Sequence, residues 1–392
     1  MKRVNKILLI YEMICICLLL NGCYDVYPIE NLGIFVGVGY DIEKDSGKDN
    51  DVTFVDPAEI PMSHDNGKPS CVYTGKGDTI YELVQNRMKK MPTKFTVGTE
   101  QIGLISEERA KYGIMDVIDA VLRDSKSNLN CLLAVTKGKC DYYLSRDNNT
   151  DETNSKILYD LLTFSHYANF FPYGITAGDV IQMYYQEGRK IFIPYIEIVN
   201  KKPEITGLAL FDADKMVYKI PMNETRLINM LRNEKSKGYI SLSASSDLDY
   251  FDIDKFDDFS LIISNSPIHY IDIMTDCKRK VKVSKENENL KYSINLNITG
   301  DLFLNTMVKQ YLDKKTIGLI EETLNKKLEK ILTDEINKIQ KVYGDDYLDL
   351  GKYAVAKYGR QKDVCSKDNF QNAIIELKVD VTIKSVGRNS RL

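Results

Sequence analysis

The chain of 392 residues carries 53 lysines and arginines against 56 aspartates and glutamates, which leaves a net charge of −3 at neutral pH. This balance argues against nucleic acid and against an anionic membrane face as partners, because both are bound through an excess of positive charge. The length allows two or three domains, each with a core of its own.

The first residues have the layout of a secretory signal. Three basic residues, Lys2, Arg3 and Lys6, precede an apolar run over residues 7–20. The run is shorter than the roughly 20 apolar residues that span a bilayer, so a secretory signal fits it better than a permanent membrane helix. No later segment of the sequence approaches transmembrane length.

A cysteine just beyond this run is a candidate for lipid attachment. The stretch Leu20-Asn21-Gly22-Cys23 resembles a bacterial lipobox. In such a sequence Cys23 receives a diacylglycerol thioether and becomes the mature N-terminus once residues 1–22 are removed. Two acyl chains hold a protein stably on a membrane, whereas one chain does so only marginally. The alternative is an ordinary signal peptide with a thiol nearby.

Strand and helix patterns alternate along the next part of the chain, which predicts a mixed α/β layer. Asp78 or Thr79 is expected to cap the first helix and Pro92 to end it. A polar, asparagine-rich stretch follows and predicts a surface loop at residues 141–156. The strands are expected at residues 33–42, 52–61, 95–106 and 130–138, and the helices at 77–92 and 107–125.

The remainder of the chain shows its clearest patterns near the C-terminus. A hairpin is expected at residues 207–220, turning at 212–214, and then a helix over 223–238 closed by Gly238. Strict alternation of apolar and polar residues over 375–383 predicts a half-exposed antiparallel strand. A long helix over residues 316–342, with one face on a sheet, is predicted from apolar residues at helical spacing: Ile317, Ile320, Leu324, Leu328, Ile331, Leu332, Ile336 and Ile339.

These elements predict an α+β protein of several domains, with mixed and antiparallel sheets, a long C-terminal amphipathic helix and a final antiparallel strand. A boundary is expected at residues 199–206, in the polar stretch VNKKPEIT. The division that we expect is a leader over residues 1–22, an N-terminal α/β region over 23–200 and a C-terminal α+β region over 201–392.

No motif for catalysis or for a cofactor stands out. The glycines at positions 33, 37 and 39 lie inside a strand and lack the helix that follows a dinucleotide loop. The sequence TGKGDT at residues 74–79 lacks P-loop spacing and is expected to be the turn before a helix. The acidic stretch 41–52 lacks the glycine and glutamate positions of a calcium loop, which favours a solvated hairpin tip.

Histidines and cysteines form no recognisable site either. His64, His166 and His269 are far apart, and none has a second ligand at helical or turn spacing. We therefore predict no catalytic residue, no cofactor and no metal, with Cys23 as the modified residue. Wide spacing and the absence of a CxxC pattern favour buried thiols over a disulfide framework for the other five cysteines of the mature chain: Cys71, Cys131, Cys140, Cys277 and Cys365.

Several segments together resemble one known family, the Ger(x)C family of spore germination proteins. Its members begin roughly with Gly-Cys-Trp-Asp and then Ile-x-x-Leu-Gly, which here read GCYD at residues 22–25 and IENLG at 29–33. Tyr24 in place of tryptophan, and Thr99 in place of histidine, depart from the family pattern. The resemblance covers residues 23 to about 387 and includes the segments 77–108, 112–139 and 206–220, the long helix and the final strand.

The resemblance implies a non-catalytic protein with a multi-domain α+β fold, three domains in the family's known form. The lipid on Cys23 would hold it on the outer face of the spore's inner membrane. There it would assemble with A-type and B-type membrane subunits as part of a nutrient germinant receptor. The B-type subunit resembles amino-acid transporters and is the better candidate to bind the germinant.

Two other functions remain open at the level of sequence. A lipid-anchored solute-binding protein of an importer would have two α/β lobes with a ligand crevice between them, which the long helix and final strand fit poorly. An exported lipid-anchored enzyme would have a convergent catalytic cluster, which the sequence does not display.

Overall fold

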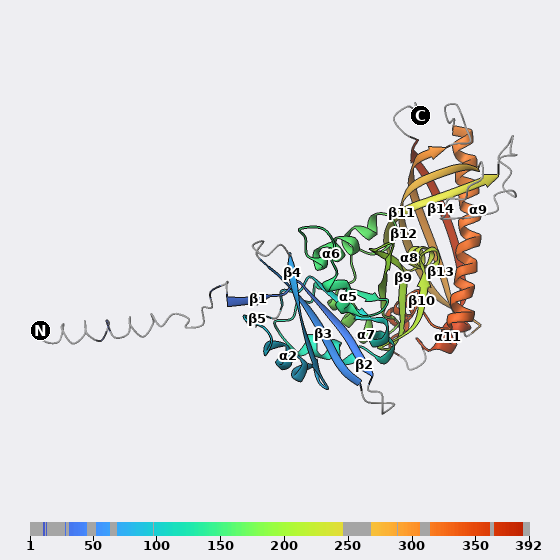
Figure 1. Ribbon diagram of the computed structural model, residues 1–392. Helices are drawn as coiled ribbons and strands as arrows, with labels where there is room; N and C mark the ends of the chain where they lie inside the picture. The colour runs from blue at the N-terminus through green and yellow to red at the C-terminus, as the bar shows by residue number, and fades with distance from the viewer. Residues whose placement is uncertain are drawn as a thin grey trace, which may run out of the picture.

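The computed structural model has a body built on one large sheet and an elongated blade that rises from it (Figure 1). The blade is formed by residues 235–245, 268–286, 289–305, 314–338 and 374–385. The structure describes the isolated residues 11, 13 and 28 and the ranges 31–44, 52–62, 69–96, 98–245, 268–287, 289–305, 314–360 and 364–386.

The large sheet has eight strands in the order β10, β9, β8, β7, β6, β2, β3, β4. Its four central strands, β2, β6, β7 and β8, are parallel, and an antiparallel meander extends each end. Every residue of β6 and β7 is buried, as expected for parallel strands covered on both faces. The strands are β2 (Gly37–Lys44), β3 (Val52–Pro61), β4 (Ser70–Gly77), β6 (Ile102–Ser106), β7 (Leu132–Thr136), β8 (Phe192–Val199), β9 (Lys202–Asp212) and β10 (Lys215–Pro221).

Helices cover both faces of this sheet. On one face, α5 (Cys140–Ser145) and α6 (Asn154–Phe164) pack against alternate residues of β6 and β7, such as Leu104 and Ala134. On the other face, α4 (Met115–Arg123) and α7 (Ala177–Tyr185) pack against Ile105 and Leu133. The remaining elements of the body are β1 (Leu32–Ile34), β5 (Lys94–Thr96), α2 (Ile80–Met88), α3 (Glu107–Tyr112), the short 3₁₀ turn Ser165–Tyr167 and α8 (Met222–Arg232).

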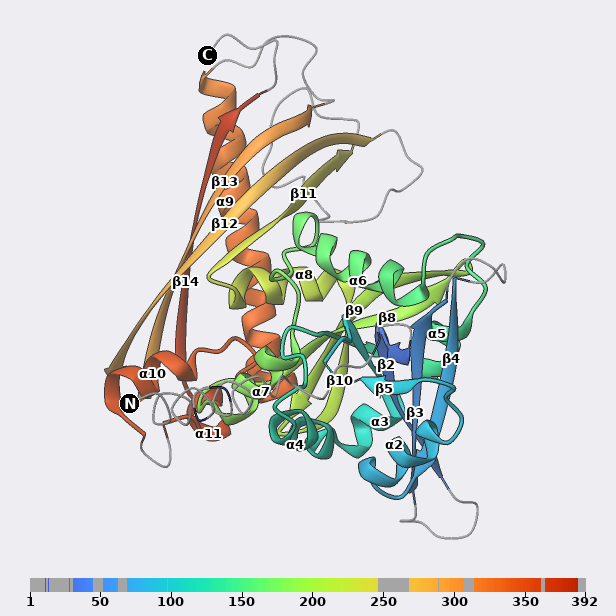
Figure 2. The same ribbon diagram turned by 90° about the vertical axis from the view of Figure 1, so that its left-hand side faces the viewer.

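The blade is a four-stranded sheet with α9 lying along it (Figure 2). Seven of the eight apolar residues expected on the sheet-facing side of the long helix are buried, and Ile331 is half-buried, so the predicted helix is confirmed. The blade's elements are β11 (Lys235–Ser245), β12 (Ile268–Glu286), β13 (Asn289–Asn305), β14 (Ile374–Ser385) and α9 (Lys314–Lys338). A π-helical turn (Ile339–Tyr343), α10 (Gly351–Tyr358) and α11 (Lys367–Gln371) follow α9.

The α+β class with mixed sheets is confirmed, but the expected antiparallel pairing of the final strand is wrong. Strand β14 pairs in parallel with β13, from Lys291↔Ile374 onward. Alternation correctly predicted the buried face of β14, because alternation reports which side faces the core. It does not report strand direction. Helix α9 returns the chain to the start of the sheet, and such a crossover makes the next strand parallel.

Side chains of α9 occupy the outer edge of β14. The backbone N–H groups of Val379, Val381 and Ile383 donate to Glu329, Asn325 and Glu321 at 3.3, 2.7 and 2.7 Å. Four helical residues rise about 6 Å and two strand residues about 6.6 Å, so the two spacings match. The contacts occupy hydrogen-bond donors that could otherwise recruit another strand.

Removing these three acceptors together is expected to expose the edge of β14. In Glu321→Ala/Asn325→Ala/Glu329→Ala, the three N–H groups should exchange with deuterium faster, and the free energy of unfolding should fall by about 1.5–3 kcal/mol. Hydrogen exchange by mass spectrometry and light scattering for self-association measure both effects. A matched triple on the exposed side of α9, Glu322→Ala/Lys326→Ala/Lys330→Ala, should leave β14 protected. Equal exchange of β14 in both triples would refute the assignment.

Two expected elements are each broken in two. The expected strand over 33–42 is interrupted at Val36, whose N–H donates to Glu59 and whose carbonyl accepts from Gln101, so that β1 pairs with β5 instead of with the large sheet. The expected helix over 107–125 ends at Gly113 and restarts as α4. Gly113 has φ of 134°, a backbone region that favours glycine.

Two further local expectations need correction. The polar stretch at 141–156 is a loop only in part, because it contains most of α5 and the first residues of α6. Helix α8 ends at Arg232 and not at Gly238, which lies within β11 against the ring of Phe170. The expected hairpin at 212–214 and the cap at Thr79 are confirmed, since Asp212 pairs with Lys215 and the Thr79 side chain accepts from Glu82 N–H.

A cluster of buried and half-buried charged side chains joins the body to the segment after α9. Asp349 accepts hydrogen bonds from Arg189 Nε and Arg232 Nε, both at 3.2 Å, and pairs with Arg232 Nη2 at 2.9 Å. Nearby, Lys190 pairs with Asp345 at 2.6 Å. The two acids follow α9, whereas the three cations belong to the loop before β8 and to α8. These ion pairs fix the end of the blade helix to the body.

The body also takes strands from both sides of residue 200. Strands β8 and β9 form a hairpin that turns at Val199↔Lys202, within the stretch 199–206 where a boundary is expected. The regions 23–200 and 201–392 therefore share the large sheet.

Candidate functional site

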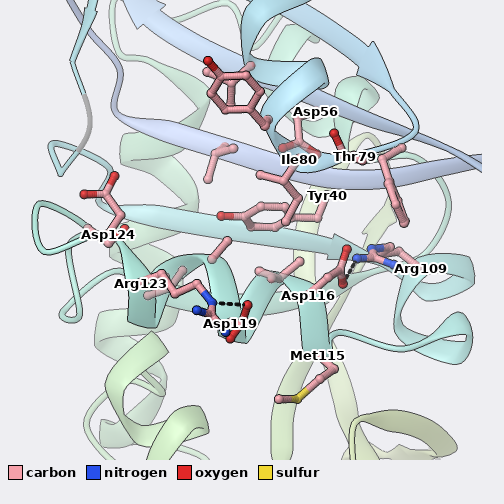
Figure 3. Close-up of a pocket in the computed structure, with 18 of the residues that line it drawn as sticks. Tyr40, Asp56, Thr79, Ile80, Arg109, Met115, Asp116, Asp119, Arg123 and Asp124 are labelled. Carbon is pink, nitrogen blue, oxygen red and sulfur yellow. Dashed lines mark hydrogen bonds and ion pairs between the residues drawn. The ribbon is translucent and has the colours of Figure 1, made fainter.

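A cavity of about 930 Å³ lies between the large sheet and helices α2, α3 and α4. Figure 3 shows side chains from strands above and from α4 below directed toward the same space. Its size is near the upper end of the range of roughly 300–1,000 Å³ that small-molecule sites occupy. The cavity is the candidate functional site of the body.

Two glycines of the TGKGDT stretch set the position of α2 beside this cavity. A Cβ on Gly75 would lie 2.3 Å from the carbonyl oxygen of Leu83, and one on Gly77 would lie 2.7 Å from the nitrogen of the same residue. Only glycine permits so close an approach of helix to strand. The stretch is the end of β4 and the turn into α2, as expected, and its glycines serve packing.

The floor of the cavity consists of side chains from β2 and β3. The pairs Val38↔Ala58 and Asp41↔Val55 bracket Tyr40 and Asp56, which places these two side chains on neighbouring strands at the same level. Asp56 points into the space between the sheet and α2 (Figure 3) and is 6% exposed. An acid thus lies in an otherwise aromatic and aliphatic floor.

Two buried arginines flank this floor. Arg87 of α2 is 3% exposed and lies over the ring of Phe95, with its Cζ 4.5 Å from the ring centroid. Arg109 of α3 is 2% exposed, lies 4.5 Å from the ring centroid of Phe54 and forms an ion pair with Asp116. Both guanidiniums are therefore held by aromatic faces, an arrangement that stabilises a desolvated cation.

Helix α4 forms the opposite wall and is positioned by a distant hairpin. Asp214, in the β9–β10 turn, accepts the N–H of Met115 at 3.1 Å, and its carbonyl accepts the N–H of Ile114 at 3.1 Å. These contacts satisfy donors at the start of α4, which explains why the helix restarts there after Gly113. On the next turn, Asp119 pairs with Arg123 at 2.6 Å.

Asp56 is the buried carboxyl of the cavity without a direct partner. Glu100 accepts N–H groups of Gly98 and Asn128, and Asp116 pairs with Arg109. No described residue forms a hydrogen bond or an ion pair with the Asp56 carboxyl, and the charges around it influence it only at longer range. Burial raises its pKa to about 7, although the charges of Arg87 and Arg109 act in the opposite direction.

Neighbouring groups do not supply an obvious general acid or nucleophile. Burial raises the pKa of the Tyr40 phenol well above its ordinary range, so this group stays protonated. The thiols of Cys131 and Cys140 are likewise shifted upward by burial, which suppresses the reactive thiolate. The arrangement can bind a polar group within an apolar space.

The residues singled out in the sequence lie elsewhere. Cys23 and His64 fall outside the described residues, as does most of the acidic hairpin tip. His166 lies near the surface, where its Nδ1 is 2.6 Å from the carbonyl of Thr163. Within the ranges that the structure describes, no group of three or more His, Cys, Asp or Glu is placed to hold a metal ion. The five remaining cysteines are free thiols, of which Cys131, Cys140 and Cys277 are buried and Cys71 and Cys365 are half-buried.

Sequence reasoning missed Asp56, Arg87 and Arg109. A signal for Asp56 exists, because it lies in the buried middle of the largely apolar strand VTFVDPAEIP. Arg87 lies four residues after the buried Leu83 on α2, and so shares its inward face. No local signal distinguishes Arg109 from a surface arginine.

Fold and cavity define the class: an α+β protein of several sheets whose body contains an open cavity of small-molecule size. Two family models match it along nearly its whole length. The spore germination protein N-terminal domain matches residues 25–198, and the spore germination B3/GerAC-like C-terminal domain matches residues 206–387. The chain belongs to this GerAC-like, or Ger(x)C, family of spore germination proteins.

Relatives and a solved structure agree with this membership. Spore germination protein KC of Bacillus subtilis (strain 168) is 23% identical, over 98% of this chain and 97% of that protein. Spore germination protein YndF of the same organism is 21% identical, over 96% of each. The crystal structure of the GerBC protein shares the fold, with a TM-score of 0.55, 15% identity and coverage of 88% of this chain and 97% of that chain.

Proposed function

We propose that this chain is the non-catalytic, lipid-anchored C-type subunit of a nutrient germinant receptor in bacterial spores. It assembles with A-type and B-type membrane subunits and couples nutrient sensing to germination. The observation that carries the proposal is the match of both spore germination family models, over residues 25–198 and 206–387. The importer alternative has no comparable support, because the relatives named above are spore germination proteins.

The proposed anchor is a diacylglycerol thioether on Cys23, exposed after removal of residues 1–22. It places the body on the outer face of the spore's inner membrane. Support comes from the basic start, the short apolar run and the Leu20-Asn21-Gly22-Cys23 stretch. Among the residues that the structure describes, none of the helices has the length and hydropathy of a membrane span. The division into regions 23–200 and 201–392 also stays a proposal, and both regions contribute to the body.

Spores that carry Cys23→Ala are expected to lose their nutrient response, as are spores that lack the gene. The response to a trigger that bypasses receptors should remain in both strains. Loss of optical density after nutrient addition measures the response. Cys71→Ala serves as a matched control, because Cys71 is a half-buried free thiol of β4, and it should respond normally.

Comparing the deletion strain with Cys23→Ala tests the receptor role and the need for a lipid anchor separately. A normal nutrient response in the deletion strain, with no related gene expressed in the spores, would contradict the receptor role. A response lost on deletion but retained in Cys23→Ala would keep the receptor role and contradict the need for a lipid.

A further inference from the structure

The cavity beside Asp56 has a strong imbalance of charge. Seven carboxyl groups but three guanidiniums line it, and no lysine does. Asp116 and Asp119 are neutralised by ion pairs with Arg109 and Arg123. The lining acids are Asp56, Asp78, Glu100, Asp116, Asp119, Asp124 and Asp214, and the lining cations are Arg87, Arg109 and Arg123. The excess of negative charge favours a positively charged occupant.

The cavity offers little to a bound anion. Among the buried guanidinium nitrogens that line this site, Arg87 Nε and Arg109 Nη1 have no hydrogen-bond partner, and both atoms lie away from the accessible space. Arg87 Nη1 faces the backbone carbonyl of Asp56 at 3.5 Å, and Arg109 Nη2 pairs with Asp116. A carboxylate in the cavity would therefore find few free donors and many like charges.

An apolar body, in contrast, fits the walls. Aromatic rings from Phe54, Tyr40 and Tyr112 line the cavity together with the aliphatic side chains of Ile80 and Val117. The face of an aromatic ring attracts a cation electrostatically and also packs against apolar groups. One buried carboxyl without a direct partner, in a mainly apolar space, is the arrangement expected for recognition of a single polar group.

We propose that this cavity binds a small organic cation, an apolar molecule with one protonated amine that pairs with the Asp56 carboxylate. The aliphatic and aromatic walls hold the apolar body. The acids at the rim raise the local concentration of cations. This inference goes beyond the receptor role, because it assigns a ligand site to this chain itself and not to its membrane partners.

The test uses the purified mature chain in detergent and phenethylamine as the probe, with binding measured by isothermal titration calorimetry. Three compounds of similar size serve as controls: 2-phenylethanol, which is neutral, 3-phenylpropionate, which is an anion, and phenylalanine, which is a zwitterion. Phenethylamine should bind at least about tenfold more tightly than each of them, since the ion pair contributes on the order of a tenfold change or more inside a desolvated site.

Asp56→Asn should weaken phenethylamine binding at least about tenfold at pH 8, because it removes the charge and keeps the shape. Glu335→Gln is the matched control. Glu335 is also a buried acid, and burial raises its pKa to about 7, but it belongs to α9 and does not line the cavity. This variant should bind phenethylamine as the unmodified chain does.

Binding should also tighten about tenfold between pH 6 and pH 8, as Asp56 becomes ionised. The charged and titratable groups that act on Asp56 are Arg87 of α2, Arg109 of α3, Asp116 of α4, and Tyr40 and Asp41 of β2. Equal binding of phenethylamine and 2-phenylethanol, tighter binding of 3-phenylpropionate, no effect of Asp56→Asn, or no binding at all would each overturn the inference. None of these results depends on germination, so a failure here is distinguishable from failure of the receptor role.

Discussion

Replacing Asp349 by alanine is expected to lower the free energy of unfolding by about 3–5 kcal/mol, because it leaves the buried Arg232 without its counter-ion. The Arg232 side chain is 1% exposed, and burial already lowers its pKa to about 10. Arg189, which also donates to Asp349, loses the same acceptor. Removal of one partner from a buried ion pair is costly because the remaining charge has neither water nor a partner.

Part of the stability lost in Asp349→Ala comes from the backbone conformation at this position. Asp349 has φ of 54°, in the left-handed region that asparagine and aspartate tolerate better than alanine. Asp349→Asn keeps that tolerance and the side-chain shape and removes only the charge. If the ion pairs account for the loss of stability, Asp349→Asn should therefore lose most of the free energy of unfolding that Asp349→Ala loses.

Denaturant unfolding followed by circular dichroism measures this effect. Asp276→Ala is a suitable control, because Asp276 pairs with Lys237 at 3.2 Å on the surface and both side chains are about half exposed. Such a pair contributes at most about 1 kcal/mol. If Asp349→Ala and Asp276→Ala reduce stability equally, the charged cluster does not hold the blade helix to the body as described.

Asp56→Asn is expected to change the pH dependence of stability by an amount on the order of 4 kcal/mol between pH 4 and pH 8. The folded state raises the pKa of Asp56 from 3.8 to about 7. Between these values the folded chain holds a proton that the unfolded chain releases. The carboxyl therefore lowers stability progressively as the pH rises from about 4 to about 7, and the penalty is complete above pH 7.

The asparagine variant has no such penalty. Relative to the unmodified chain it should become more stable as the pH rises from 4 to 8, and melting temperatures over this range measure the difference. Glu335→Gln should behave in the same direction, because burial raises that pKa from 4.5 to about 7. A curve for Asp56→Asn parallel to that of the unmodified chain would contradict the assignment.

Buried charges have opposite effects on stability at Asp349 and at Asp56. Asp349 and its arginines neutralise one another, so each stabilises the folded state while the other is present. Asp56 has no such partner and lowers stability at neutral pH. A ligand that supplies a positive charge would remove this penalty, and stabilisation by phenethylamine should accordingly be lost in Asp56→Asn.

Sequence patterns alone determined those features that depend on one face of one element. The apolar spacing from Ile317 to Ile339 was sufficient for α9, and the alternation from Ile375 to Ile383 was sufficient for the buried face of β14. The turn at 212–214 and the cap at Thr79 also follow from local chemistry. The resemblance to the family rested on the order of such segments along the chain.

Tertiary structure decided everything that depends on residues far apart in the chain. Periodicity indicates which residues of a strand are buried but not the direction of the strand, and β14 is parallel to β13 because α9 crosses over the sheet between them. The break between α3 and α4 depends on Asp214, 99 residues beyond Met115. Asp56 is buried without a direct partner because α2, α3 and α4 pack against its strand. These helices are distant from Asp56 in the chain or follow it, so local sequence does not determine which groups surround the carboxyl.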